Sequence, residues 1–325
     1  MANIKEIARI AGVSVTTVSR VLNDHPYVSE VKRTAVLNTI ERLNYRRNMN
    51  AVHLITGRTQ AIAVIIPYIN LFYFSVIIEG LAQEALLAQY RLILCQTDYR
   101  PEEELKVLEM LRNKEIDGVV IVSTTMSSEV IEEYTAYGPI VICQDRGERS
   151  FSSVYIEHYS AFRYVLQYLS DKGYRKIGYC EGRQHGNSSS IRQTALSDFL
   201  AETGQPVHED WMFYGCLSEE DGVRTLHRLL AMKDKPDALI ISSDHVAAGL
   251  IIEAWKNGVH IPEDLAVIGF DDQPIGRALG LTTIDNQLLK MGVVAFQIIH
   301  EQIKGNDKNP VYHKLEYRII ERSTV

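Results

Sequence analysis

Residues Ala11–Asn23 read Ala-Gly-Val-Ser-Val-Thr-Thr-Val-Ser-Arg-Val-Leu-Asn, and this stretch decides the fold of the N-terminal part of the chain. Gly12 is typical of the residue that ends a helix, because it adopts left-handed backbone angles without strain. Ser14 is a good N-cap for a second helix, so only a tight turn separates the two helices. The apolar residues of the second helix recur at the spacing of one buried face, and they are Val18, Val21 and Leu22.

Capping residues also mark the start of the first helix of this pair and of a third helix after it. Asn3 can cap the first helix, with Glu6 three residues on as in a capping box. Ser29 is the expected cap of a third helix. Two helices joined by so tight a turn form a helix-turn-helix, a motif that can place its second helix in the major groove of DNA. A small three-helix bundle whose polar face is merely solvated is the alternative.

The second helix turns a short, hydroxyl-rich face outward. Serine and threonine hydroxyls reach base edges or phosphates, threonine methyls can touch thymine methyls, and arginine can grip guanine. The outward residues are Val15, Thr16, Thr17, Ser19 and Arg20. These residue types therefore favour a DNA-reading helix over a purely structural one.

The distribution of charge agrees with a polyanion partner for this region alone. Residues 1–60 hold nine Lys and Arg and four Asp and Glu, a net charge of +5, whereas the remainder of the chain carries −12. A basic head on an acidic body attracts nucleic acid at the head only. Residues 46–58 are predicted to link the two parts, with Asn48 as a possible cap and Gly57 as a possible end of a helix. About eight residues make a helix that is marginal in water by itself.

The 325 residues suggest about two domains, and 46% hydrophobic with 23% charged residues exclude a disordered chain. Apolar runs such as Ala61–Pro67 are far too short to span a bilayer, and the first residues have no signal-peptide core. We therefore expect a cytoplasmic protein with no membrane partner. Its four cysteines form no C-x-x-C pair and lie in or beside apolar runs, so we expect reduced, buried thiols.

The body alternates short apolar runs with helical stretches, and this alternation falls into two similar halves. Continuous apolar strands separated by helices are typical of parallel sheets covered on both faces. The predicted strands are Ala61–Ile66, Leu92–Cys95, Gly118–Val122, Ile140–Cys143, Val154–Ile156, Lys176–Cys180, Ala238–Ser242 and Leu265–Phe270. We predict two doubly wound subdomains that face a cleft.

In such folds a ligand binds where the parallel strands end. Aromatic residues follow the first strand at Phe72, Tyr73 and Phe74, and polar groups follow several later strands. Carboxylates and guanidinium groups bind hydroxyl pairs, and rings stack on C–H faces, so this set suits a sugar. For Asp244 and Asp272 a role as helix N-cap is an equally good interpretation.

Several segments closely resemble the LacI/GalR family of transcriptional regulators. In the head they are Ile4–Ala8, the run Ala11–Asn23 and Val28-Ser29; in the body they are Pro262–Leu265, Val267–Asp272 and Leu281–Ile284. The resemblance implies an all-α helix-turn-helix headpiece on an α/β core of two doubly wound, periplasmic-binding-protein-like subdomains. It implies a headpiece of residues 1–58 with a hinge helix at about 48–56, and an effector-binding and dimerisation domain of residues 59–325. Three crossings between the subdomains would assign about 59–158 and 289–318 to one, and about 159–288 and 319–325 to the other.

The resemblance also implies which residues bind. For DNA they are Ser14, Val15, Thr16, Thr17, Ser19, Arg20, Asn23, Ser29, Asn48, Ala51 and Leu54, with Leu54 at the position of a leucine that wedges a base step. For the effector they are Tyr73, Phe74, Arg146, Arg192, Asp244 and Asp271.

The chain departs from the family pattern in the hinge and in the pocket. Arg47 stands where proline is usual, Val52 where Arg or Gln is usual and His53 where Ser is common. These departures bear on how tightly the hinge couples to DNA. Leu217 stands where the family often has an aromatic ring. Stacking in the pocket would then depend on Phe72, Tyr73 and Phe74.

These observations predict a homodimeric, sequence-specific repressor of carbohydrate uptake or catabolism genes. It would bind a pseudo-palindromic operator in double-stranded DNA under allosteric control by a small sugar-like effector. Control by a protein co-regulator such as a phosphocarrier, or action as an activator, are the alternatives. A stand-alone sugar-binding protein would explain the body alone. No dinucleotide-binding, Walker A, G-x-S-x-G or H-E-x-x-H motif is present, so we expect no enzyme, no catalytic residue, no cofactor and no metal.

Overall fold

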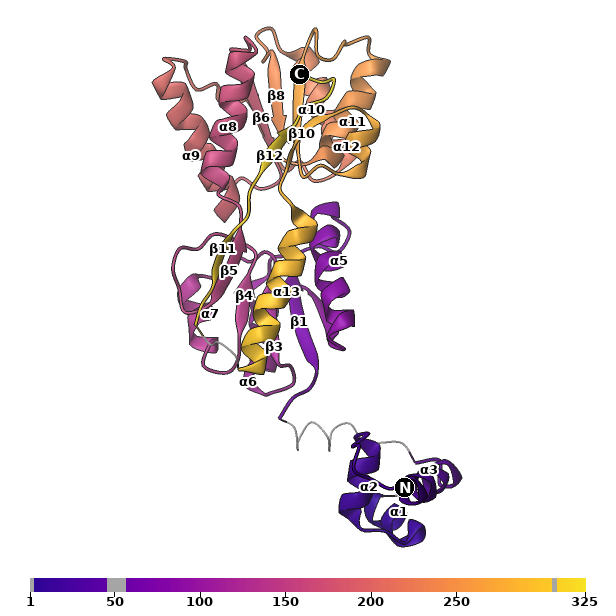
Figure 1. Ribbon diagram of the computed structural model, residues 1–325. Coiled ribbons are helices and arrows are strands. Elements are labelled where there is room, and N and C mark those ends of the chain that lie inside the picture. The colour runs from indigo at the N-terminus through magenta and orange to yellow at the C-terminus, as the bar shows by residue number, and fades with distance from the viewer. Residues whose placement is uncertain (1–2, 46–56, 306–308) are drawn as a thin grey trace. The chain divides into compact units, whose positions relative to one another are not determined.

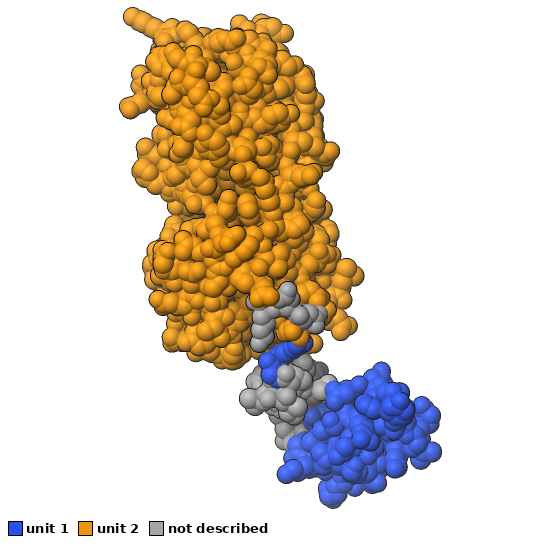
Figure 2. All heavy atoms as spheres, turned by 60° about the vertical axis from the view of Figure 1, so that its left-hand side comes forward, with its two compact units in different colours: residues 1–58 blue, residues 59–325 orange. Residues whose placement is uncertain are grey.

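The computed structural model describes residues 3–45, 57–305 and 309–325. The chain divides into two compact units, Met1–Arg58 and Thr59–Val325, which are coloured separately in Figure 2. Within the described ranges, no helix is both long enough and apolar enough to cross a membrane.

The described residues of the N-terminal unit form three helices, α1 (Ile4–Ala11), α2 (Val15–Leu22) and α3 (Glu30–Arg42) (Figure 1). The Asn3 side chain accepts a hydrogen bond from the N–H of Glu6, and the Ser14 hydroxyl accepts one from the N–H of Thr17. Gly12 ends α1 at φ 65°, as its sequence position predicts. Ser29 precedes α3 but makes no capping bond with its side chain. The small core consists of Ile7, Ala8, Val18, Val21 and Val36.

The first half of the second unit is built on a six-stranded sheet in the order β11-β5-β4-β3-β1-β2, with all neighbours parallel. Its strands are β1 (Ala61–Ile66), β2 (Arg91–Gln96), β3 (Gly118–Ile121), β4 (Ile140–Ile142), β5 (Ser152–Tyr155) and β11 (Tyr312–Lys314). Its helices are α5 (Phe72–Leu87), α6 (Pro101–Arg112), α7 (Ser128–Tyr134) and α13 (Leu288–Lys304), and they cover both faces (Figure 1).

The second half repeats this plan in the order β12-β10-β9-β8-β6-β7. Its strands are β6 (Ile177–Glu181), β7 (Met212–Tyr214), β8 (Ala238–Ile241), β9 (Ala266–Phe270), β10 (Thr282–Asp285) and β12 (Arg318–Ile320). Its helices are α8 (His158–Asp171), α9 (Asn187–Glu202), α10 (Glu219–Ala231), α11 (Asp244–Lys256) and α12 (Pro274–Ala278), with a 3-10 turn at Glu209–Trp211. Only β12 runs antiparallel to its neighbour among the described strands.

The chain passes between the two halves three times, at residues 156–157, 286–287 and 315–317. The helix after the second passage, α13, packs against α5 of the first half. Both helices have a glycine at the contact: a Cβ on Gly292 would lie 2.0 Å from the carbonyl oxygen of Ile77, and one on Gly80 would lie 2.2 Å from that of Leu289. The close packing of these helices therefore requires both glycines.

The predicted α/β core of two doubly wound sheets is confirmed, with differences at its margins. Strands β7, β11 and β12 have only three residues each, which is too short for a clear sequence signal. Strand β2 was predicted from its apolar residues, yet it forms a sheet edge and most of it is exposed. Three of the cysteines are buried free thiols, whereas Cys95 on this edge strand is partly exposed.

Candidate functional site

The outward face of α2 forms the first candidate site. Thr16 and Arg20 are exposed, and Val15 keeps 42% of its surface in solvent. The side chain of Arg20 makes no hydrogen bond or ion pair within the described residues. Ser14 differs, because its hydroxyl caps α2 and lies 2.9 Å from the Thr17 hydroxyl. Arg20 is therefore the cation on this helix that is available to a partner.

The other predicted DNA contacts are either exposed residues of the same unit or lie outside the described part. Asn23 is exposed, and its amide donates to the carbonyl oxygen of Ser19 at 2.9 Å. Ser29 is exposed at the start of α3. The hinge helix predicted at 48–56, with Asn48, Ala51 and Leu54, falls outside the described residues. Arg47, Val52 and His53 fall outside them as well.

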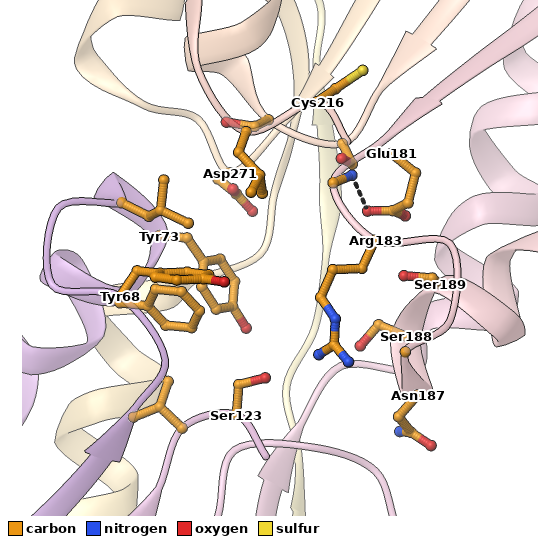
Figure 3. Close-up of a pocket in the computed structure, with 18 of the residues that line it drawn as sticks. Tyr68, Tyr73, Ser123, Glu181, Arg183, Asn187, Ser188, Ser189, Cys216 and Asp271 are labelled. Carbon is orange, nitrogen blue, oxygen red and sulfur yellow. Dashed lines mark hydrogen bonds between the residues drawn. The ribbon is translucent and has the colours of Figure 1, made fainter. Parts of the chain in front are cut away.

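The second candidate site is a cavity of about 1010 Å³, including its open part, between the two sheets of the C-terminal unit. It opens where the parallel strands end, as expected for a doubly wound fold. Figure 3 shows the aromatic side chains of Tyr68 and Tyr73 on one side and polar residues from the end of β6 to the first turn of α9 on the other. The aromatic lining is Tyr68, Phe72, Tyr73, Phe74 and Tyr99.

A buried ion pair is part of the wall of the second half. Nη1 of Arg192 lies 3.0 Å from Oε2 of Glu181, and both side chains are about nine-tenths buried. Tyr179 donates its hydroxyl to the same carboxylate, and the guanidinium lies 4.8 Å from the centre of the Phe270 ring. Burial, reinforced by the Arg192 charge, holds the pKa of His158 well below its usual value. The neutral His158 ring can therefore accept the Arg192 N–H that lies 3.3 Å from its Nδ1.

Asp271 contributes the other carboxylate of the lining. Its oxygens accept hydrogen bonds from the side-chain amides of Asn286 at 2.8 Å and Gln273 at 3.3 Å. Burial raises its pKa to about 6, although the two amides and Arg192 oppose that shift. Its backbone has φ 97°, a conformation rare outside glycine. Strained backbone of this kind concentrates at functional sites.

Four of the six predicted effector residues line the cavity: Tyr73, Phe74, Arg192 and Asp271. Arg146 and Asp244 do not. Arg146 donates a hydrogen bond to Oε1 of Gln144 at 3.0 Å, and Gln144 itself lines the cavity. Arg146 can thus orient a lining residue.

Asp244 is fully buried at the start of α11 and is occupied by protein partners. Its carboxylate accepts from the Thr283 hydroxyl and from the backbone N–H of Gln273, both at 2.7 Å. A Cβ on Gly269 would lie 2.1 Å from one of its oxygens. These partners occupy the Asp244 carboxylate, which ties α11 to β10 and to the N-cap of α12.

Sequence reasoning missed several lining residues. Ser123 directly follows the predicted third strand, and Glu181 and Arg183 directly follow the sixth, so the strand-end rule could have found them. Tyr99 could not be found in this way, because it reaches the cavity from a loop before α6. Leu217 lines the cavity where an aromatic ring would be usual, and Phe72, Tyr73 and Phe74 line it from α5.

Comparisons with known proteins agree with this architecture. The model for bacterial regulatory proteins of the lacI family matches residues 3–48, and a periplasmic binding protein-like domain matches residues 166–325. The uncharacterized HTH-type transcriptional regulator YkvZ of Bacillus subtilis (strain 168) is 42% identical over 326 residues, which cover 100% of both chains. The NTD biosynthesis operon regulator NtdR of the same strain is 37% identical over 94% of both chains.

A solved structure of the lac repressor dimer bound to operator and the anti-inducer ONPF superposes with a TM-score of 0.84. It is 20% identical and covers 99% of this chain and 98% of the repressor, so it supports the fold alone. A helix-turn-helix unit followed by a two-sheet, periplasmic-binding-protein-like core defines a class of DNA-binding transcriptional regulators. The chain belongs to the LacI family of this class, as the full-length relatives show.

Proposed function

We propose that the chain is a homodimeric repressor whose affinity for a pseudo-palindromic operator is set by a small sugar-like effector. In this proposal residues 1–58 form the DNA-binding headpiece and residues 59–325 bind the effector and dimerise. The observation that carries it is the cavity between the two sheets, where aromatic rings face a buried arginine and two carboxylates. Aromatic rings can stack on the C–H faces of a sugar, and charged groups can bind its pairs of hydroxyls, so this lining suits a carbohydrate.

The exposed face of α2 supports the DNA-binding half of the proposal. An arginine without a protein partner, flanked by hydroxyl-bearing residues, suits base edges in a major groove. The lac repressor, which shares the fold, is described as a dimer bound to its operator. A two-fold dimer would present two copies of α2 to two half-sites, so the operator would be an approximate palindrome.

Exposed apolar residues support the homodimer. Leu86 and Leu87 at the end of α5 each keep 79% of their surface in solvent, and Ile93 and Leu94 of β2 are also exposed. An exposed edge strand is a liability unless something covers it. On α11 of the other half, Trp255 is 55% exposed. A second copy of the chain that covers these residues would remove apolar surface from water.

Allosteric control would work through the relative position of the two halves. Two polar contacts already join them across the cavity: the guanidinium of Arg183 lies 3.7 Å from the centre of the Tyr99 ring, and the Asn187 amide donates to the carbonyl oxygen of Asp145 at 3.0 Å. An effector that binds one arrangement better shifts the population toward it. In a dimer, that shift would change the separation of the two hinge segments and thus their binding to the operator.

Sequencing the genomic fragments that the purified chain retains tests this function. At moderate salt without ligand, we expect one pseudo-palindrome to be enriched beside genes for sugar uptake or breakdown. The selection is then repeated with candidate sugars, one of which should change the yield of the same fragments. Fragments without a common two-fold motif under every condition would contradict the proposal.

A further inference from the structure

One cation of the cavity has no carboxylate partner. The lining contains two arginines, Arg183 and Arg192, and two carboxylates, Glu181 and Asp271. Glu181 is neutralised by Arg192, whereas no ion pair of Arg183 is found within the described residues. Figure 3 shows the side chain of Arg183 extending into the open space between Tyr68 and Ser188.

The guanidinium of Arg183 is held in place by neutral groups. It packs on the face of the Tyr99 ring at 3.7 Å, and Nη2 donates to the backbone carbonyl of His185 at 3.1 Å. The Tyr99 hydroxyl is in turn 3.0 Å from the hydroxyl of Ser123, which lines the same end of the cavity. This arrangement orients the guanidinium but leaves its charge, Nε and Nη1 for another partner.

The start of α9 adds further donors at this end. Its N-cap is Gly186, which has no side chain to cap the first N–H groups of a 16-residue helix. These groups carry partial positive charge and commonly hold anions. Asn187, Ser188 and Ser189 of the first turn all line the cavity.

Ser189 provides an independent sign that a ligand binds here. The residue as a whole keeps only 6% of its surface exposed, and no hydrogen bond of its hydroxyl is found within the described part of the chain. Figure 3 shows the hydroxyl directed toward the cavity. The hydroxyl lines the cavity, so a ligand bound there can supply the hydrogen bond that the described protein groups do not. The Nε of Arg192, which is also buried, lacks a partner in the described residues as well.

We propose that this end of the cavity is an anion subsite and that the effector is a phosphorylated sugar. Arg183, the first turn of α9 and the Ser188 and Ser189 hydroxyls would bind the phosphate. A phosphomonoester has three terminal oxygens and about two negative charges, which match a guanidinium together with several N–H and O–H donors. The sugar ring would lie toward Tyr73, Arg192 and Asp271. This inference rests on the proposed sugar-controlled function and deepens it.

Titration calorimetry on the full-length chain tests the subsite. The unphosphorylated probes are glucose, fructose and ribose. The phosphorylated probes are glucose 6-phosphate, fructose 6-phosphate, ribose 5-phosphate and glucose 1-phosphate, and inorganic phosphate is tested alone. We expect at least one sugar phosphate to bind roughly tenfold or more tightly than its parent sugar, with an affinity that falls as salt is raised. Binding of parent sugars as tight as that of their phosphates, or binding of no phosphorylated probe, would overturn the inference.

Two variants locate the effect. Arg183→Gln should weaken the sugar phosphate about tenfold and leave its parent sugar unchanged, so that the preference for phosphate disappears. Arg228→Gln is the matched control, because Arg228 also packs on a ring, that of Phe213 at 4.7 Å, but lies outside the cavity. Equal loss in both variants, or an unchanged preference in Arg183→Gln, would refute the assignment. Retention of genomic fragments by the same wild-type preparation distinguishes failure of the anion subsite from failure of the proposed repressor function. If the protein retains fragments and responds to unphosphorylated sugars, the repressor function stands and only the subsite is refuted.

Discussion

At the scale of single residues, two aspartates near the cavity have opposite roles. Asp244 is fully buried, and its two short hydrogen bonds join three elements of the second half. Asp271 lines the cavity, receives weaker support from two amides and carries strained backbone. From sequence alone both follow a strand and both looked like effector ligands. The sequence could not distinguish the two aspartates, because only the folded structure shows that the Asp244 carboxylate is already occupied by buried hydrogen bonds.

Asp244→Ala should destabilise the protein strongly. The change leaves the Thr283 hydroxyl and the N–H of Gln273 without their buried acceptor, which costs about 2 to 4 kcal/mol of unfolding free energy. Urea unfolding of residues 59–325 within the full chain measures it, with Asp244→Asn as the milder control. A stable Asp244→Ala protein that fails to bind effector would instead make Asp244 a direct ligand.

Asp271→Asn should stabilise the protein increasingly as pH rises. The pKa of Asp271 in the folded protein is about 6, above the usual 3.8. The protonated carboxyl therefore favours folding at low pH, and this contribution to the unfolding free energy of the wild type is lost as pH rises through 6. The unfolding free energy of Asp271→Asn relative to wild type should therefore grow by about 1.4 kcal/mol between pH 5 and pH 8. Urea titrations at both pH values measure this. A constant difference would show that Asp271 titrates normally.

Arg20→Ala should weaken operator binding and relax the preference at one base pair, at a cost of about 1 to 3 kcal/mol. The physical reason is that Arg20 is exposed on α2 with no protein partner in the described chain. Fluorescence anisotropy with an operator series substituted at each position measures both effects. Arg42→Ala, an exposed arginine of α3, is the control. An unchanged base preference in Arg20→Ala would contradict the role of this residue.

At the scale of elements, the edge strand β2 and the end of α5 are the parts of the first half that most need a partner. Leu87→Glu should raise the dimer dissociation constant tenfold or more, because it places a charge in an apolar interface. Sedimentation equilibrium measures the constant. Leu230→Glu, at an apolar position of α10 that is 40% exposed, should leave it unchanged. A wild-type chain that sediments as a monomer would refute the dimer itself.

The elements also show how much the sequence can predict. Gly12 and Ser14 mark the turn between α1 and α2, and the run Ala61–Ile66 coincides with β1, because capping chemistry and continuous apolar runs are local signals. Strand β11 has no such signal: its residues are polar, and pairing with β5 makes it a strand. The cavity was partly predictable for the same reason. Strand ends can be identified from sequence, whereas the contact of Arg183 with Tyr99 joins two loops from different halves.

At the scale of the whole molecule, the proposed function links a cavity in residues 59–325 to a DNA-reading helix in residues 1–58. Neither site needs to touch the other for this link. Thermodynamic linkage requires only that effector and operator favour different arrangements of the dimer, and it then acts equally in both directions. Couplings of this kind typically change affinity by about 5-fold to 150-fold.

The most direct test of this claim is a paired titration on the full-length protein. Operator affinity is measured by anisotropy with and without a saturating concentration of the sugar or sugar phosphate that binds most tightly, and the affinity for that ligand is measured with and without saturating operator. The account predicts that both affinities change by the same factor, of at least about fivefold. An operator affinity that stays the same when the cavity is filled would contradict the central claim that this protein is an effector-controlled regulator.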